Sequence, residues 1–216
     1  MTLRARLAAL LVLLAAAAPA AAGPGPMLWQ ERYFWDALLT ARDKLARQQS
    51  DPMMIPVMNA IAGQIAQQVA NLKQIDAYVK AQSANLRYAY GQPDPQPSLA
   101  TILGNFKTLT TGADQVRQNL YYLTARERMA SSQALQDQGM YKAGLLILGQ
   151  IQQLQLTLNA LYYDTLAVRN LVLQNRWAED RFFVHEADGL MRAVVYVQDS
   201  VFAVYNAGYD LTIRCR

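Results

Sequence analysis

Among the 216 residues there is one histidine and one cysteine, and this scarcity excludes several kinds of site. A structural zinc site needs four ligands, usually nitrogen or sulfur atoms, so His185 and Cys215 cannot build one. A zinc-protease helix carries two histidines four positions apart, and Gly189 occupies the position where the partner of His185 would stand. A single cysteine also leaves no intramolecular disulfide.

Nucleophile and phosphate-binding motifs are missing too. The sequence has no Gly-x-Ser-x-Gly elbow, and its glycines do not form phosphate-cradling loops. A carboxylate-rich site is an alternative, because Glu179, Asp180, His185, Glu186 and Asp188 lie close together in the sequence. Such charge clusters on helices are usually exposed, so we expect a solvated acidic face with an ordinary boundary histidine. The sequence therefore predicts no enzyme, no metal and no cofactor.

Charge is sparse, and the basic residues do not cluster. There are 20 basic and 16 acidic residues, a formal net charge of +4. Two of the basic residues, Arg4 and Arg6, stand near the start; without them 18 basic residues face 16 acidic ones, a net charge of +2. No Lys/Arg patch remains that would suggest nucleic acid or an anionic membrane surface. We expect protein partners, self-association included, and no nucleic acid.

Residues 1–22 have the pattern of a cleaved export signal. Two arginines precede an apolar run over residues 7–18, and small residues follow at 19–23. The run is too short to span a bilayer, which takes ~20 residues. We expect cleavage after Ala22 and a mature chain, residues 23–216, that forms one helical domain in the periplasm or is secreted.

Prolines and apolar periodicity divide this mature chain. We expect a flexible start over residues 23–27 and a helix over residues 28–48. Residues 50–52, which end in Pro52, break this helix. From Met58 to Leu86 apolar residues alternate in steps of three and four, a coiled-coil-like spacing. The two rows are Met58, Ile65, Leu72, Val79 and Leu86, and Ile61, Gln68, Ile75 and Gln82. If buried, the two glutamines would find partners and fix the register.

Residues 91–98 contain three prolines and predict a loop inside the domain. We expect a short helix over 99–109, a turn over 110–112, and helix from 115 to 175 with a break near Gly139. A last helix is predicted from the heptad spacing of Phe183 to Val204, although the β-branched residues of 193–197 leave a strand as the alternative. The fold class is thus all-α: an elongated bundle of about five or six helices, with long coiled-coil-like antiparallel helices.

Residues 143–163 form an uncharged run of 21 positions. Its four glutamines and one asparagine argue against a transmembrane span. We expect a helix covered on most sides, by its own neighbours rather than by another subunit. Gly144 and Gly149 in it predict close helix contacts.

Some residues suggest contacts with other proteins. Four aromatic residues lie within seven positions: Trp29, Tyr33, Phe34 and Trp35. Such aromatic side chains fill bundle cores or anchor interfaces. Glutamines such as Gln150 and Gln153 stand on the long helices where charged residues are usual. We expect them to contact the helices of partner proteins. Cys215 can form an intermolecular disulfide in an oxidising compartment, although a dangling chain end is the simpler interpretation.

The export signal, the glutamine-rich long helices and the proline-broken connections together are similar to exported helical subunits of bacterial secretion or conjugation machines. The sequence predicts a non-enzymatic exported protein that acts through protein-protein association in such an envelope assembly. Two alternatives stay open. One is a bundle that holds a small apolar ligand, lipid or metal in the periplasm, and the other is an enzyme that uses the cluster from Glu179 to Asp188.

Overall fold

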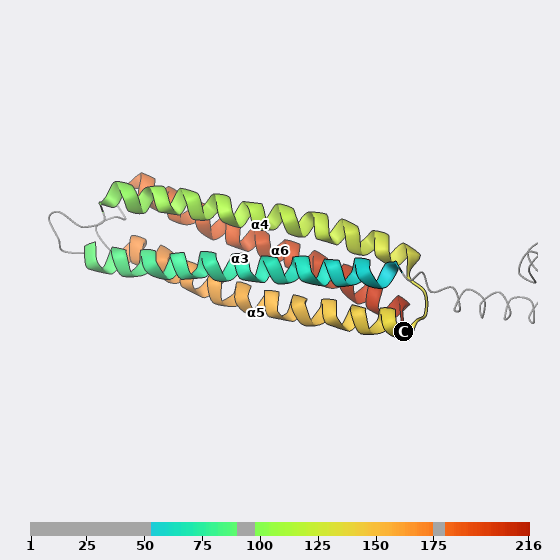
Figure 1. Cartoon of the computed structure of the whole chain (residues 1–216). Coiled ribbons are helices and arrows are strands. Elements are labelled where there is room, and N and C mark those ends of the chain that lie inside the picture. Colours follow the sequence, from blue (N-terminus) through green and yellow to red (C-terminus); the bar gives the residue numbers. More distant parts are fainter. Residues whose placement is uncertain (1–52, 90–97, 175–179) are drawn as a thin grey trace, which may run out of the picture. The chain divides into compact units, whose positions relative to one another are not determined.

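The computed structural model describes residues 53–89, 98–174 and 180–216, and every regular element in them is an α-helix (Figure 1). The helices are α3 (Met54–Ala89), α4 (Leu99–Gln133), α5 (Gln138–Gln174) and α6 (Arg181–Arg214). All four belong to one compact unit, Arg47–Arg216. The predicted all-helical bundle is confirmed for these residues. The helix expected over 28–48 lies outside them, so the total of five or six remains a prediction, as does the coiled-coil character.

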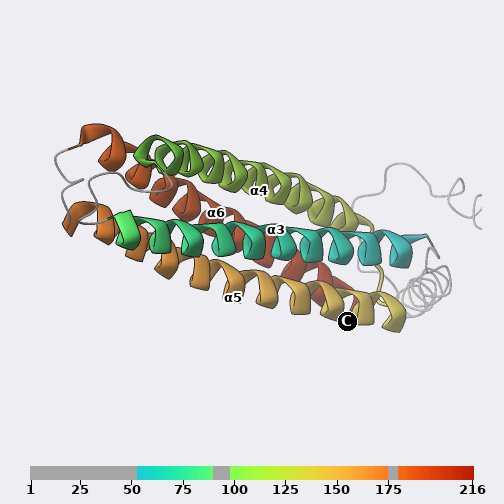
Figure 2. The same cartoon turned by 60° about the vertical axis from the view of Figure 1, so that its left-hand side comes forward.

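The four helices occupy the corners of a square. Helix α3 contacts α4 and α5, and α6 contacts the same two helices, so α3 and α6 lie on one diagonal. Both views show α3 and α5 running in one direction and α4 and α6 in the other (Figures 1 and 2). The connection between α4 and α5 therefore crosses the end of the bundle diagonally. Each helix has one parallel and one antiparallel neighbour.

Contacts between neighbouring helices define their register. Between α3 and α5, Ile55 packs on Gly139, and Lys80 Nζ lies 3.4 Å from Asp164 Oδ2. Between α4 and α6, Lys107 Nζ lies 3.7 Å from Glu186 Oε1, and the Arg117 guanidinium lies 5.7 Å from the centre of the Tyr196 ring. The two pairs on each interface have the same separation in sequence. A constant offset is what two helices that run parallel to each other require, because both rise by the same distance per residue.

The predicted apolar rows face the centre of the bundle. Both rows of α3 are buried, including the two glutamines. So are the rows of α5 and α6, namely Ile147, Ile151, Leu154, Leu158, Leu161, Thr165, Val168 and Val172, and Phe183, Ala187, Leu190, Val194, Val197, Val201 and Val204. The strand alternative for residues 193–197 is wrong, because Val194 and Val197 continue the helical row of α6.

Two amide clusters join α3 to α4. Gln68 Oε1 accepts hydrogen bonds from Asn71 Nδ2 at 3.1 Å and from Asn119 Nδ2 on α4 at 3.2 Å. Two heptads further along, Gln82 Oε1 accepts from Asn105 Nδ2 on α4 at 3.1 Å. The buried glutamines thus have partners across the interface, as expected, and these bonds specify how α3 aligns with α4.

We expect Gln68→Ala to destabilise the bundle by about 1–2 kcal/mol, because it leaves the amide of Asn119 without its partner at a half-buried position. Denaturant unfolding followed by circular dichroism measures the change. The control is Gln74→Ala, since Gln74 is exposed on the same helix. Equal effects of the two substitutions would contradict a register role for the amide cluster.

The turn predicted over residues 110–112 is wrong, because α4 continues through it. Thr110 Oγ1 donates to Phe106 O and Thr111 Oγ1 to Lys107 O, both at 3.0 Å, so their hydroxyls are satisfied within the helix. Leu109 and Ala113 are buried on either side. Burial of this row outweighs the low helix propensity of Thr and Gly.

The break predicted near Gly139 is confirmed, between the end of α4 and Gln138. Asp137 begins α5: its Oδ1 accepts from Met140 N at 2.9 Å, the pattern of an N-terminal cap. At the other end of the bundle Ser98 caps α4 by accepting from Thr101 N. The rest of the predicted loop, residues 91–97, lies outside the described residues.

No helix in residues 53–89, 98–174 and 180–216 combines the length and apolar character needed to cross a membrane.

Candidate functional site

Of the six side chains predicted to form a partner surface, Gln150 and Gln153 lie among the described residues. Trp29, Tyr33, Phe34 and Trp35 lie outside the described residues. Gln150 is half-buried on α5, and Gln153 is exposed on the same helix. Neither residue lines the groove between α5 and α6, whose α5 wall consists of Gln155, Leu158 and Asn159.

The uncharged run of α5 is covered on one side only. Its apolar row faces the core, but Leu145, Leu146, Leu156 and Tyr163 are exposed, Leu156 by 57% and Tyr163 by 68%. The expectation that its own neighbours cover this helix on most sides is wrong for the described part of the chain, where α5 contacts two helices, α3 and α6. An uncharged side of α5, with large apolar side chains and the amides Gln152, Gln153 and Asn159, therefore remains exposed.

Helix α6 extends this open face. Val195, Phe202 and Tyr209 recur every seven residues and are all exposed, Phe202 by 64%. Tyr205 stacks on Tyr209, with ring centres 6.1 Å apart. Strict seven-residue spacing places the row along one side of the helix, away from the buried seam. Helix α6 thus carries two apolar rows, one inside the bundle and one outside.

We call these two exposed stripes the α5–α6 surface, made of Leu145, Gly149, Leu156 and Tyr163 on α5 and Val195, Phe202 and Tyr209 on α6. A groove of about 500 Å³ runs between the stripes, with Phe202 at its edge. In residues 143–163 and 193–209 together, Asp199 is the only charged side chain. The sequence had pointed to the missing charge on α5 but not to the exposed row of α6.

A second groove, of about 360 Å³, lies between α4 and α6. Its walls carry Tyr121, Tyr122 and Tyr196, and Arg117, which stacks over Tyr196. Arg117 is also in an ion pair with Asp114, at 3.4 Å. The cation of this groove is therefore already paired, and Asp199 lines this groove as well as the one between α5 and α6.

The acidic residues proposed as an alternative active site do not form one site in the described part of the chain: one caps a helix, and two form ion pairs with residues of other helices. Asp180 caps α6 by accepting from the backbone N–H groups of Phe182 and Phe183. Glu186 pairs with Lys107, and Asp188 Oδ1 lies 2.6 Å from Arg169 Nε. His185 is exposed, and Glu179 lies outside the described residues. Within the part of the chain that the structure describes, no three His, Cys, Asp or Glu side chains are grouped to hold a metal.

Cys215 does not dangle. Its side chain is buried, and its carbonyl oxygen accepts from Asp137 N at 3.2 Å, which ties the end of α6 to the start of α5. Burial, with a smaller contribution from the Asp137 charge, raises the pKa of the thiol. An intermolecular disulfide, which stays a prediction, would need the last turn of α6 to open first.

The structure also contains a buried carboxyl group that the sequence analysis missed. Glu127 on α4 is 0% exposed, and neither carboxylate oxygen has a hydrogen-bond partner among the described residues. Burial raises the pKa of this carboxyl from its ordinary 4.5 to about 8. Gly208 on α6 faces it: a Cβ there would lie 3.2 Å from Glu127 Oε1.

The missed signal was periodicity. The buried residues of α4 include Phe106, Ala113, Leu120 and Glu127, one every seven residues. The seven-residue spacing continues across Thr110 and Thr111. Extending it from Phe106 to position 127 would have predicted that Glu127 is buried.

Comparison with protein-family models, with curated proteins and with solved structures gave no match to this chain.

Proposed function

We propose that this chain is an exported, non-catalytic helical protein that works by binding other proteins, as a component or accessory of a bacterial envelope or secretion-type assembly. The observation that carries the proposal is the α5–α6 surface. It combines exposed leucine, phenylalanine and tyrosine side chains with almost no charge. Loss of charge and enrichment in aromatic residues distinguish the centre of a protein interface from other surface.

The comparison with α3 supports this interpretation. Residues 53–72 of α3 also lack charge, yet after Val57 their exposed side chains are small or amide-bearing: Asn59, Ala60, Gly63, Gln64, Gln67 and Ala70. Low charge alone therefore does not produce exposed large apolar side chains in this bundle. On α6 such side chains recur at seven-residue intervals, and on α5 Leu156 and Tyr163 have the same spacing, which another helix can contact.

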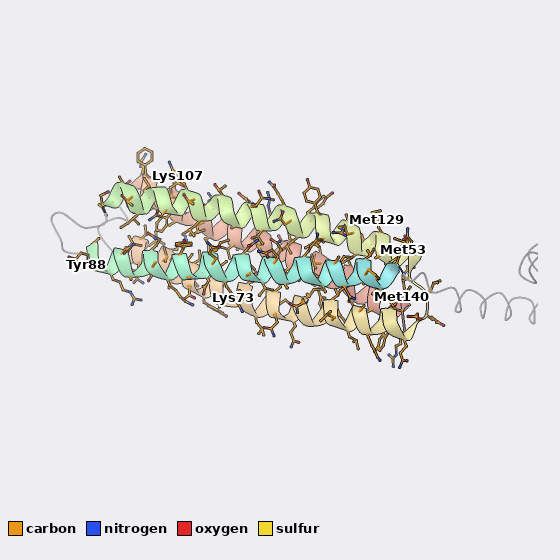
Figure 3. The ribbon with its side chains drawn as sticks, viewed as in Figure 1. Met53, Lys73, Tyr88, Lys107, Met129 and Met140 are labelled. Atoms are coloured by element: carbon orange, nitrogen blue, oxygen red, sulfur yellow. The ribbon has the colours of Figure 1, made fainter. Side chains whose placement is uncertain are left out.

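The proposal predicts that a photo-activated cross-linker introduced at Leu156 captures defined protein partners in the native host. The matched control is Met129, an exposed apolar side chain of similar exposure near the end of α4 (Figure 3). Mass spectrometry of the products should find adducts at position 156 that are missing at position 129. The same products from both positions, or none from either, would contradict the proposal.

Export is tested separately. N-terminal sequencing of the protein recovered from the native host should begin at Gly23, because the export signal is expected to be cleaved after Ala22. A product that retains residues 1–22 would contradict this part of the proposal.

A further inference from the structure

We propose that the α5–α6 surface binds a second copy of this chain, in a two-fold arrangement that lays the two α5 helices antiparallel with Leu156 of each at the axis. This inference rests on the proposed function and names its partner.

The two stripes of the surface are level with each other. In two antiparallel helices, residues at the same level have residue numbers with a nearly constant sum. Two contacts between α5 and α6 give this sum: Arg169 with Asp188 adds to 357, and Gly144 with Thr212 adds to 356. The pairs Tyr163 and Val195, Leu156 and Phe202, and Gly149 and Tyr209 each add to 358. A sum of 358 is within two of the sums of the contacting pairs, so the two residues of each pair lie at nearly the same level on α5 and α6. The surface therefore consists of three successive cross-rows.

These cross-rows are complementary to themselves. Leu156 lies midway between Gly149, seven residues before it, and Tyr163, seven residues after it. A Cβ at Gly149 would meet no atom within 4 Å, so that position is open, whereas the side chain of Tyr163 protrudes. A two-fold axis through Leu156 puts Tyr163 of each copy over Gly149 of the other. The protruding ring then fills the open position, as a knob fills a hole.

The charge of the surface is compatible with a second copy. In a two-fold interface the same patch meets itself, so a charge close to the axis lies near its own copy. Asp199 is the only charge in these segments, which keeps such repulsion small. The surface also offers little charge by which to select an oppositely charged protein. Its charge thus permits self-association.

The size of the surface is also adequate. The uncharged run of α5 is about 30 Å long, and two adjacent helices are about 20 Å wide. The flat footprint is therefore on the order of 600 Å², against ~800 Å² of accessible surface per partner in a standard interface. Protruding side chains such as Tyr163 and Phe202 raise the accessible area above the footprint.

The first test is the mass of the mature chain in solution, by light scattering or sedimentation equilibrium. We expect a dimer, and we expect Leu156→Glu to halve the mass while leaving the circular dichroism and melting temperature unchanged, since Leu156 is exposed. Met129→Glu introduces the same charge on α4 and should leave the dimer intact. A monomeric parent chain, or equal dissociation by both substitutions, would overturn the inference.

The second test is the register. Under mild oxidation Leu156→Cys should give a disulfide-linked dimer, because the axis brings the two copies of this position together. The double variant Gly149→Cys with Tyr163→Cys should link as well, and Gly149→Cys alone should not, since its own copies lie about 20 Å apart along the helices. Efficient linkage through Gly149→Cys alone, or none through Leu156→Cys, would overturn the arrangement.

These outcomes separate the inference from the proposed function. A monomer whose position 156 still captures a different host protein would overturn self-association and keep the proposed function. A monomer that captures nothing would overturn both.

Discussion

Replacing Glu127 with glutamine should remove most of the pH dependence of bundle stability between about pH 4.5 and 8. The carboxyl is buried in the α4 seam without a hydrogen-bond partner among the described residues, and its pKa in the folded chain is about 8. In the unfolded chain the same carboxyl ionises near its ordinary 4.5. Over this window the unfolded state therefore binds fewer protons than the folded state, and stability falls as the pH rises.

The size of this effect follows from the two pKa values. Below about pH 4.5 the carboxyl is neutral in both states and contributes no pH dependence. Above about pH 8 it is ionised in both states, and the full penalty of burying the charge is present. A difference of roughly 3.5 pKa units corresponds to about 4–5 kcal/mol. This is a large share of the stability of a typical domain, about 5–15 kcal/mol.

The measurement is the free energy of unfolding of the parent chain and of Glu127→Gln from pH 5 to 9. The variant should be the more stable one at pH 9, and the two curves should converge toward pH 5. Asp199→Asn removes an exposed carboxyl and should retain the slope of the parent chain. Parallel curves for the parent and Glu127→Gln would show that Glu127 is not the buried acid we describe.

Replacing Gly144 with valine should destabilise the bundle by about 3 kcal/mol, by forcing α5 and α6 apart. A Cβ at Gly144 would lie 2.7 Å from Thr212 Oγ1 and 3.1 Å from Thr212 Cα. The backbone atom cannot rotate away. The hydroxyl is held as well, because Thr212 Oγ1 donates to Gly208 O at 2.7 Å.

Thermal unfolding provides the measurement, and a loss of this size lowers the melting temperature by roughly 6–12 °C in a domain of this length. Gly63→Ala is the control, because a Cβ there meets nothing within 4 Å. The control should stabilise α3 by about 0.5–1 kcal/mol, since alanine has the higher helix propensity. A neutral Gly144→Val would mean that α5 and α6 are not in close contact at this level.

The two glycines of α5 show how far sequence reasoning reached. Both predicted close helix contacts, and the prediction is correct for Gly144 and wrong for Gly149, which faces open space. The two positions differ only in direction around the helix, and direction depends on where the neighbouring helices lie. A square bundle without contacts along its diagonals leaves one side of every helix open.

The candidate site shows the same limit. The sequence identified the charge-free run of α5, but its coverage depended on the position of α6. The exposed row of Val195, Phe202 and Tyr209 was hidden behind the stronger buried row of the same helix. Glu127 was missed because propensity suggested a turn at Thr110, where the burial of Leu109 and Ala113 keeps α4 continuous.

By itself, the sequence determined the helical class and the buried rows. Apolar residues spaced three and four positions apart lie on one side of a helix, whatever that helix packs against. Only the tertiary structure decided which helices are neighbours, which apolar residues stay exposed, and that Glu127 is enclosed without a counter-charge. Those properties belong to surfaces of different helices brought together, and the periodicity within one helix carries no record of its neighbours.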